Sequence, residues 1–303
     1  MYEGVINIYK EKGYTSHDVV AKLRGILRQK KIGHTGTLDP DAEGVLLVCL
    51  GKATKLCDML TERDKTYRAT MLLGRETDTQ DTTGTTIAEA AVPSEASHEE
   101  EIRQAVLSFQ GDYAQVPPMY SALKVGGKKL YELAREGKEV ERAARPVTIH
   151  HIEVESIQIP RVVMTVSCSK GTYIRTLCHD IGRKLGYGAC MESLLRIQVG
   201  RFGLESSLRL DEVERLRDEG ELLSHILPID AMFDSYLALA VSLEGDRLVH
   251  NGNPFAPDLL ADPKPAEDTP VRVYDSQGVF IGVYEYRAEG QVYRPVKIFF
   301  GGN

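Results

Sequence analysis

Residues 33–44 read Gly33-His34-Thr35-Gly36-Thr37-Leu38-Asp39-Pro40-Asp41-Ala42-Glu43-Gly44. Three glycines in twelve residues predict a backbone that turns sharply or approaches a ligand closely. Pro40 biases the residue before it, Asp39, away from helical geometry. The loop therefore holds one carboxylate with few conformational options, although a purely structural Asp-Pro turn explains the same pattern.

Other kinds of site are not indicated by the sequence. Neither residues 33–44 nor residues 125–129 have the glycine and lysine spacing of a phosphate-binding P-loop. The cysteines are odd in number and form no CxxC pair, so we expect reduced, mostly buried thiols. They are Cys49, Cys57, Cys168, Cys178 and Cys190. We expect no metal and no cofactor.

The segments on either side of the loop mix helices and strands. A helix is predicted from an N-cap at Thr15 or Ser16, and another is predicted to end at Gly186. Residues 66–73 and two stretches within 147–168 are predicted strands, whereas 75–97 is predicted to be mainly loop. Because these elements do not follow a regular βαβ repeat, we predict an α+β fold, a mixed sheet flanked by helices, rather than a doubly wound one.

The last part of the chain differs in composition. Residues 254–270 are rich in Pro and Asp, which predicts a loop. Short strands are predicted around it, at 236–242, 271–275, 279–287 and 291–299. A chain of 303 residues is long enough for two domains. We therefore predict domains at 1–232 and 235–303, the second small and β-rich.

The charges are unevenly distributed. The chain has 37 basic and 44 acidic residues and a net charge of −7, which alone argues against a nucleic-acid partner. Two basic clusters argue for one, although solvated helix faces would give the same pattern. They comprise Lys22, Arg24, Arg28, Lys30 and Lys31, and then Lys124, Lys128 and Lys129. The chain has no apolar run long enough to span a bilayer and no signal-peptide pattern, so we expect a cytoplasmic protein without membrane contact.

Six motifs in order resemble those of the bacterial tRNA pseudouridine-55 synthases, the TruB-type pseudouridine synthases. The resemblance is collinear over about residues 4–205 and weaker beyond, chiefly at 251–254. The motifs lie at residues 4–20, 33–46, 64–69, 74–84, 116–124 and 170–177. One departure is Glu11, because the family usually has proline after the residue that matches Lys10.

The resemblance implies an enzyme that isomerises uridine 55 in the T loop of tRNA, with a PUA-like RNA-binding domain at residues 235–303. It implies that Asp39 is the catalytic carboxylate, that Arg175 pairs with it, and that Tyr67 stacks on the displaced base. Two roles are open to such an aspartate: covalent attack on the sugar or base, or removal of the 2′ proton to give a glycal. Both require an ionised, fixed carboxylate.

The resemblance and the basic clusters together predict residues that contact RNA. They are His34, Lys10, Lys30, Lys31, Lys124, Lys128, Lys129, Tyr173 and Leu194, although core packing explains Leu194 equally well. The T arm of tRNA is the expected partner. We expect a monomer with no obligate protein partner. The alternative function is a non-catalytic tRNA-binding or tRNA-folding module.

Overall fold

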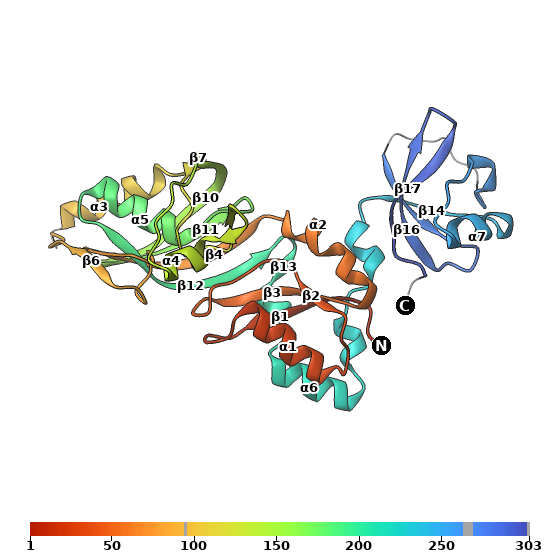
Figure 1. Cartoon of the computed structure of the whole chain (residues 1–303), viewed down its shortest axis with the longest axis horizontal. Coiled ribbons are helices and arrows are strands. Elements are labelled where there is room, and N and C mark those ends of the chain that lie inside the picture. Colours follow the sequence, from red (N-terminus) through yellow and green to blue (C-terminus); the bar gives the residue numbers. More distant parts are fainter. Residues whose placement is uncertain (94–95, 263–268, 302–303) are drawn as a thin grey trace.

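The computed structural model describes residues 1–93, 96–262 and 269–301. Figure 1 shows a large N-terminal part, built around one long sheet, and a small C-terminal part at the other end of the molecule. None of the helices in these ranges is both long and apolar enough to cross a membrane.

The central sheet runs through the whole N-terminal part. Its strands, in spatial order, are β1 (Gly4–Lys10), β3 (Glu43–Leu50), β12 (Ala189–Val199), β4 (Lys65–Leu73), β11 (Arg161–Cys168), β10 (Arg145–Gln158) and β7 (Gly111–Gln115), with β2 (Ile32–His34) beside β3 and β13 (Phe202–Gly203) beside β12. All neighbours are antiparallel except β3 and β12, which pair in parallel over two residue pairs. This short pairing joins the two halves of the sheet next to the Asp39 loop.

Helices cover the two halves separately. The α-helices are α1 (Ser16–Ile26), α2 (Cys57–Thr61), α3 (Ala96–Leu107), α4 (Leu130–Arg135), α5 (Ile174–Leu185), α6 (Leu210–Glu219) and α7 (Leu243–His250). The 3-10 helices are η1 (Gly51–Leu56), η2 (Leu204–Ser206), η3 (Leu222–His225), η4 (Ile229–Phe233) and η5 (Pro257–Leu259). One apolar core joins α1 and α6 to β1 and β3, and a second joins α3 and α5 to β4, β10, β11 and β12.

Two small hairpins lie outside the central sheet. One is formed by β5 (Arg75–Thr77) and β6 (Thr86–Glu89), and the other by β8 (Lys124–Val125) and β9 (Lys128–Lys129). The first lies in residues 75–97, which the sequence predicts to be mainly loop. The threonines and aspartates there form strand ends and a tight turn, because their side chains hydrogen-bond to nearby backbone.

The C-terminal part has its own four-stranded sheet and core. Its strands, in spatial order, are β14 (Leu237–Ala240), β15 (Pro270–Tyr274), β16 (Phe280–Arg287) and β17 (Val292–Ile298). They match the four short strands predicted from sequence. A further core joins this part to the rest of the chain, where the Phe233 ring lies 6.2 Å from that of Phe280 and 5.9 Å from that of Phe299. In addition, Lys55 Nζ donates to the carbonyl of Ile298 at 2.7 Å.

The predicted α+β class is confirmed. Thr15 caps α1 through a reciprocal pair of hydrogen bonds with Asp18. Gly186 ends α5 in the left-handed conformation, at φ +81°.

Candidate active site

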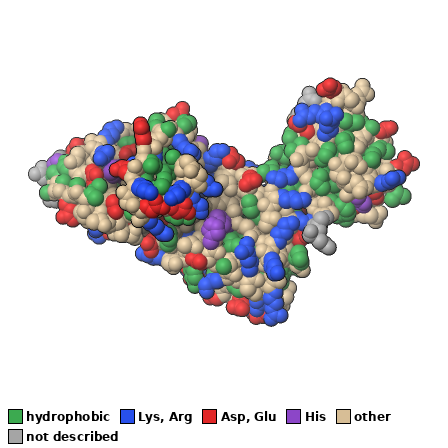
Figure 2. Space-filling view, in the orientation of Figure 1, with side chains coloured by type: hydrophobic (Ala, Val, Ile, Leu, Met, Phe, Trp, Pro, Cys, Tyr) green, Lys and Arg blue, Asp and Glu red, His purple; other side chains and the backbone are tan. Residues whose placement is uncertain are grey.

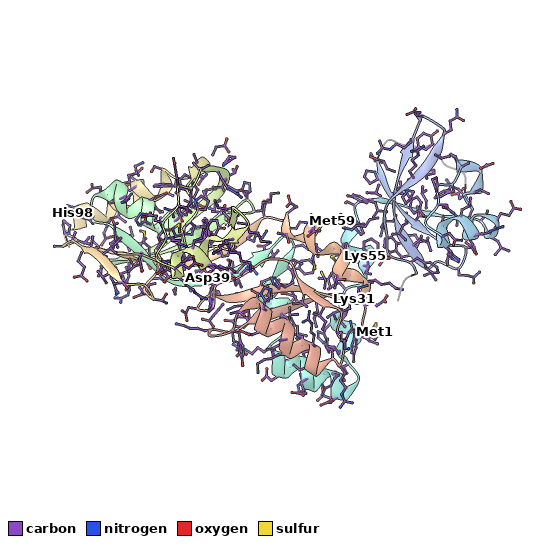
Figure 3. All side chains as sticks on the ribbon, viewed as in Figure 1. Met1, Lys31, Asp39, Lys55, Met59 and His98 are labelled. Atoms are coloured by element: carbon purple, nitrogen blue, oxygen red, sulfur yellow. The ribbon has the colours of Figure 1, made fainter. Side chains whose placement is uncertain are left out.

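The Asp39 loop connects β2 to β3 and crosses the junction of the two half-sheets (Figure 3). The amide of Leu38 donates to Ser16 Oγ at 2.9 Å, and the amide of Gly13 donates to the carbonyl of Pro40 at 2.9 Å. At its far end, Gly44 adopts φ +102°, and a Cβ there would lie 2.2 Å from the carbonyl oxygen of Arg196. Only glycine allows β3 to approach the backbone of β12 so closely.

Lys10 is buried and hydrogen-bonds to the backbone of the Asp39 loop. Its side chain is 0% exposed, and Nζ donates to the carbonyls of Pro40 at 3.0 Å, Ala42 at 2.5 Å and Glu11 at 3.3 Å. Burial lowers the pKa of Lys10 to about 8, although the Asp39 carboxylate partly opposes this. The prediction that Lys10 contacts RNA is therefore corrected, since its ammonium is fully occupied under the loop.

Glu11, the departure from the family pattern, forms an ion pair with Arg209 at 2.5 Å. This pair fixes the end of β1 against the start of α6. The end of β1 is the segment that the family's proline is expected to shape.

Arg175 binds the Asp39 carboxylate. Arg175 is the second residue of α5, and its side chain is 6% exposed. Nε lies 2.9 Å from Asp39 Oδ2, and Nη2 donates to Oδ1 at 3.3 Å. The same guanidinium donates to the carbonyls of Thr79 at 3.0 Å and Tyr120 at 2.9 Å. The predicted contact is present, and the fork of Arg175 has a single orientation because its donors are engaged on several sides.

Asp81 is a second carboxylate beside Arg175, which the sequence analysis did not single out. It lies in the turn between β5 and β6, and Oδ2 is 3.5 Å from Arg175 Nη1. Its Oδ1 accepts from Thr79 Oγ1 at 2.7 Å and from the amide of Thr83 at 3.0 Å. The motif at 74–84 also contains Asp78, whose carboxylate accepts from the amide of Thr85, and no spacing rule separates the two.

These charges set the ionisation of Asp39. Burial raises its pKa above the ordinary 3.8, Arg175 opposes that rise, and the negative charge of Asp81 adds to it. Lys10 also favours the ionised form. The side chain remains 40% exposed, so a ligand can reach the carboxylate.

Tyr67 lies on β4 with its ring buried, opposite Arg196 on β12. Burial raises the pKa of Tyr67, and the neighbouring Arg196 guanidinium lowers it. Arg196 is 2% exposed and also donates to the carbonyl of Val45 at 2.7 Å. Sequence reasoning missed Arg196, although a charged residue inside an apolar stretch is a signal for a buried interaction.

Leu194 is buried in the core that also contains Tyr67, Leu38 and Ala42. It therefore packs beneath the Asp39 loop. Its burial agrees with core packing, and a contact between Leu194 and RNA stays a prediction.

His34 and Tyr173 are half-buried. The His34 ring lies edge-on to that of His17 at 5.0 Å, and its Nδ1 accepts from the amide of Gly36 at 3.3 Å. Burial lowers the pKa of His34, so its neutral form is favoured. The backbone of Tyr173, just before α5, exchanges two hydrogen bonds with the side chain of Gln115 on β7. Burial raises the pKa of Tyr173.

The remaining predicted RNA contacts lie in two separate places. Lys30 and Lys31 are exposed between α1 and β2, and Figure 3 shows Lys31 near Lys55 on the flank facing the C-terminal part. Figure 2 shows many Lys and Arg side chains over this region.

The second group lies on the β8–β9 hairpin. Lys124 and Lys128 are exposed, but Lys128 Nζ lies 3.2 Å from Glu136, and Lys129 Nζ donates to the Tyr131 hydroxyl at 3.2 Å. Lys124 therefore has the most freely presented ammonium of the three.

Known proteins are similar to this chain over most of its length. Residues 24–174 match the N-terminal domain of the TruB family pseudouridylate synthases, and residues 175–234 match the C-terminal domain of tRNA pseudouridylate synthase B. The tRNA pseudouridine synthase B of Lachnoclostridium phytofermentans is 50% identical over 98% of this chain and 99% of its own length. That of Alkaliphilus oremlandii is 48% identical over 86% of this chain and 85% of its own length.

A solved structure gives the same result for the fold. The crystal structure of a Cbf5-Nop10-Gar1 complex contains a chain that is 28% identical, with a TM-score of 0.72 over 98% of this chain and 85% of that one. The residues that match the first family domain include the Asp39 loop and Tyr67. Arg175 is the first residue that matches the second. The chain therefore belongs to the TruB family of pseudouridylate synthases.

Proposed function

We propose that this pseudouridine synthase converts uridine 55 in the T loop of tRNA into pseudouridine, with Asp39 as its catalytic carboxylate. The observation that carries the proposal is the Asp39–Arg175 pair, which joins two separate segments of the chain and leaves the carboxylate partly exposed. The named relatives act on tRNA, and the motif at residues 33–44 supports the same target.

The reaction requires little beyond positioning and acid–base chemistry. The N1–C1′ bond breaks, the uracil turns, and C5 joins C1′, so the product is an isomer and no group donor is consumed. Asp39 acts ionised, either by covalent attack or by removing the 2′ proton. Arg175 orients the carboxylate and favours its charge through one ion pair and one hydrogen bond, which offset part of the burial and the charge of Asp81.

Tyr67 and Leu194 form the apolar floor on which the uracil turns. The Tyr67 ring stacks on the base, and its hydroxyl, whose pKa Arg196 lowers, lies near the C5 proton that must leave. A buried apolar floor also keeps water from the broken glycosidic bond.

The base must leave the RNA stack to reach this floor, at a cost of roughly a few kcal/mol. His34 helps to displace it, and Tyr173 contacts the displaced nucleotide. Phosphate contacts from Lys30, Lys31, Lys124, Lys128 and Lys129 offset the cost.

Catalysis and additional RNA binding are assigned to different parts of the chain. Residues 1–232 form the catalytic domain, and residues 235–303 form a PUA-like domain that binds RNA away from the chemistry. We also propose that the enzyme works on tRNA in the cytoplasm as a monomer without an obligate protein partner. Truncation after Asp234 should weaken tRNA binding and leave the single-turnover rate at saturating tRNA intact. Because Phe233 packs on Phe280 and Phe299, the truncated chain must first be shown to melt cooperatively.

The direct test of function is incubation with an unmodified tRNA transcript, followed by mapping of pseudouridine at each position. The expected result is one pseudouridine at position 55 and none in a matched transcript with cytidine there. Binding of the transcript without any pseudouridine would favour the non-catalytic tRNA-folding module, and a pseudouridine elsewhere would contradict the assigned target.

A further inference from the structure

Two cysteines, Cys49 and Cys57, meet beside the strand that carries His34. Cys49 lies on β3 directly opposite Gly33 on β2. A Cβ atom on Gly33 would lie 3.1 Å from Cys57 Sγ. Residues opposite each other in a sheet project their Cβ atoms on one face, about 4.5–5.5 Å apart. The Cys57 sulfur therefore covers the face from which Cys49 projects, which places the two thiols next to each other.

The two thiols have unequal surroundings. Cys49 is 0% exposed, whereas Cys57, the first residue of α2, is partly exposed. The neighbouring Cys49 thiol lowers the pKa of Cys57, burial and the Asp58 carboxylate oppose this, and Lys297 of β17 lowers it further. The neighbouring Cys57 thiol and burial raise the pKa of Cys49. Because the thiolate is the nucleophile, Cys57 is the reactive partner and Cys49 the resolving one.

Helix α2 connects this pair to the active-site loop. At one end, Cys57 contacts Gly33; at the other, Thr61 Oγ1 donates to the carbonyl of Thr35 at 2.9 Å. Both contacts flank His34, on the segment that leads into the Asp39 loop. A change in the position of α2 therefore acts on His34 and on the start of that loop.

We propose that Cys49 and Cys57 form a site of reversible oxidation, at which a peroxide converts the two thiols into a disulfide. The Cys57 thiolate attacks one peroxide oxygen, the O–O bond breaks, and the first water leaves after protonation. The Cys49 sulfur then attacks the resulting sulfenic sulfur, an S–S bond replaces the S–O bond, and the second water carries away the Cys49 proton. Two electrons pass from the sulfurs to the peroxide, and an added dithiol returns them.

The disulfide should slow tRNA modification, a consequence that rests on the proposed function. A covalent bond to the Cys49 sulfur draws the Cys57 sulfur away from its place over Gly33. Displacement of the attached loop by about 1 Å can cost on the order of a hundredfold in rate, and we expect a fall of about tenfold or more.

The chemical test uses the full chain and hydrogen peroxide, followed by alkylation, digestion without reductant and mass spectrometry. The expected product is a pair of peptides linked through Cys49 and Cys57, absent after treatment with dithiothreitol. Cys178 and Cys190 provide the internal control, because both are 0% exposed and should stay reduced. The link should be absent in Cys57→Ala and in Cys49→Ala, and present in the matched variant Cys190→Ala.

Two results would overturn the site: oxidation of Cys57 to a sulfinic acid while Cys49 stays a free thiol, or no oxidation under conditions that oxidise a free cysteine. This readout needs no tRNA, so its failure is distinct from failure of the proposed function. For the effect on rate, peroxide should slow the wild type reversibly and leave Cys57→Ala unaffected. A disulfide that forms without changing the rate would overturn the link to activity.

Discussion

Arg175 Nε lies 2.9 Å from Asp39 Oδ2, although the two residues are 136 positions apart in the chain. Arg175 is almost fully buried, whereas the Asp39 side chain is 40% exposed. The arginine is thus the fixed partner, and the carboxylate is the one that a ligand can reach.

The fixed orientation of Arg175 makes a mild substitution costly. Arg175→Lys keeps the charge but loses the planar fork that reaches Asp39, Thr79 and Tyr120 together. We expect a fall in single-turnover rate of about a hundredfold at saturating tRNA, with a much smaller loss of affinity. Tyr67→Phe, which removes only a hydroxyl, is the comparison. Full recovery of the Arg175→Lys rate at saturating tRNA would show that Arg175 serves binding instead.

Asp81 should shift the pH dependence of the reaction. The rate requires ionised Asp39, so it falls as pH drops through the Asp39 pKa, which burial and Asp81 hold above 3.8. Asp81→Asn removes one negative neighbour, which lowers the Asp39 pKa and moves the acid limb of the single-turnover profile to lower pH. A uniform loss of rate with an unmoved limb would assign Asp81 a purely structural role.

Lys10 should matter for stability. Lys10→Met leaves three backbone carbonyls without their donor, which should cost about 1–3 kcal/mol of unfolding free energy near neutral pH. The pKa of Lys10 is about 8 in the folded protein and 10.5 ordinarily. Between these two pH values the unfolded state binds more protons than the folded state, so wild-type stability rises with pH. The gap between wild type and Lys10→Met in urea unfolding should therefore widen over that window. An unchanged gap would contradict the buried, partly neutralised amine.

The fold and part of the site could be predicted from the sequence, for physical reasons that differ from residue to residue. The glycines and Pro40 identify the Asp39 loop locally, and period and capping identify α1, α5 and the C-terminal strands. The contact with Arg175 depends on how the half-sheets join, which no local spacing encodes, so only resemblance indicated it. Asp81 could not be separated from Asp78 because both occupy similar turn positions.

Residue type misled the prediction for Lys10. Lysine is almost never fully buried, so a surface role was the natural expectation. Two carbonyls of the Asp39 loop, those of Pro40 and Ala42, together with the carbonyl of Glu11, override that preference.

The basic flank should appear in the salt dependence of binding. Each phosphate neutralised contributes a log–log slope of about −0.7 to −0.9. Replacing Lys30 and Lys31 with Ala should flatten the slope, whereas the matched change Lys184→Ala, at a residue whose ammonium is bonded to Ser108 near α3, should not. Equal slopes for wild type and the double variant would mean that this flank faces away from the RNA.

Asp39→Asn tests the central claim most directly, because it keeps size and shape and removes only the charge. The measurement is the single-turnover rate of pseudouridine formation at saturating tRNA, with the tRNA dissociation constant determined on the same preparation. We expect the rate to fall by about a thousandfold or more while the dissociation constant changes by no more than a few-fold. Turnover near the wild-type rate would contradict the account and remove Asp39 from the mechanism.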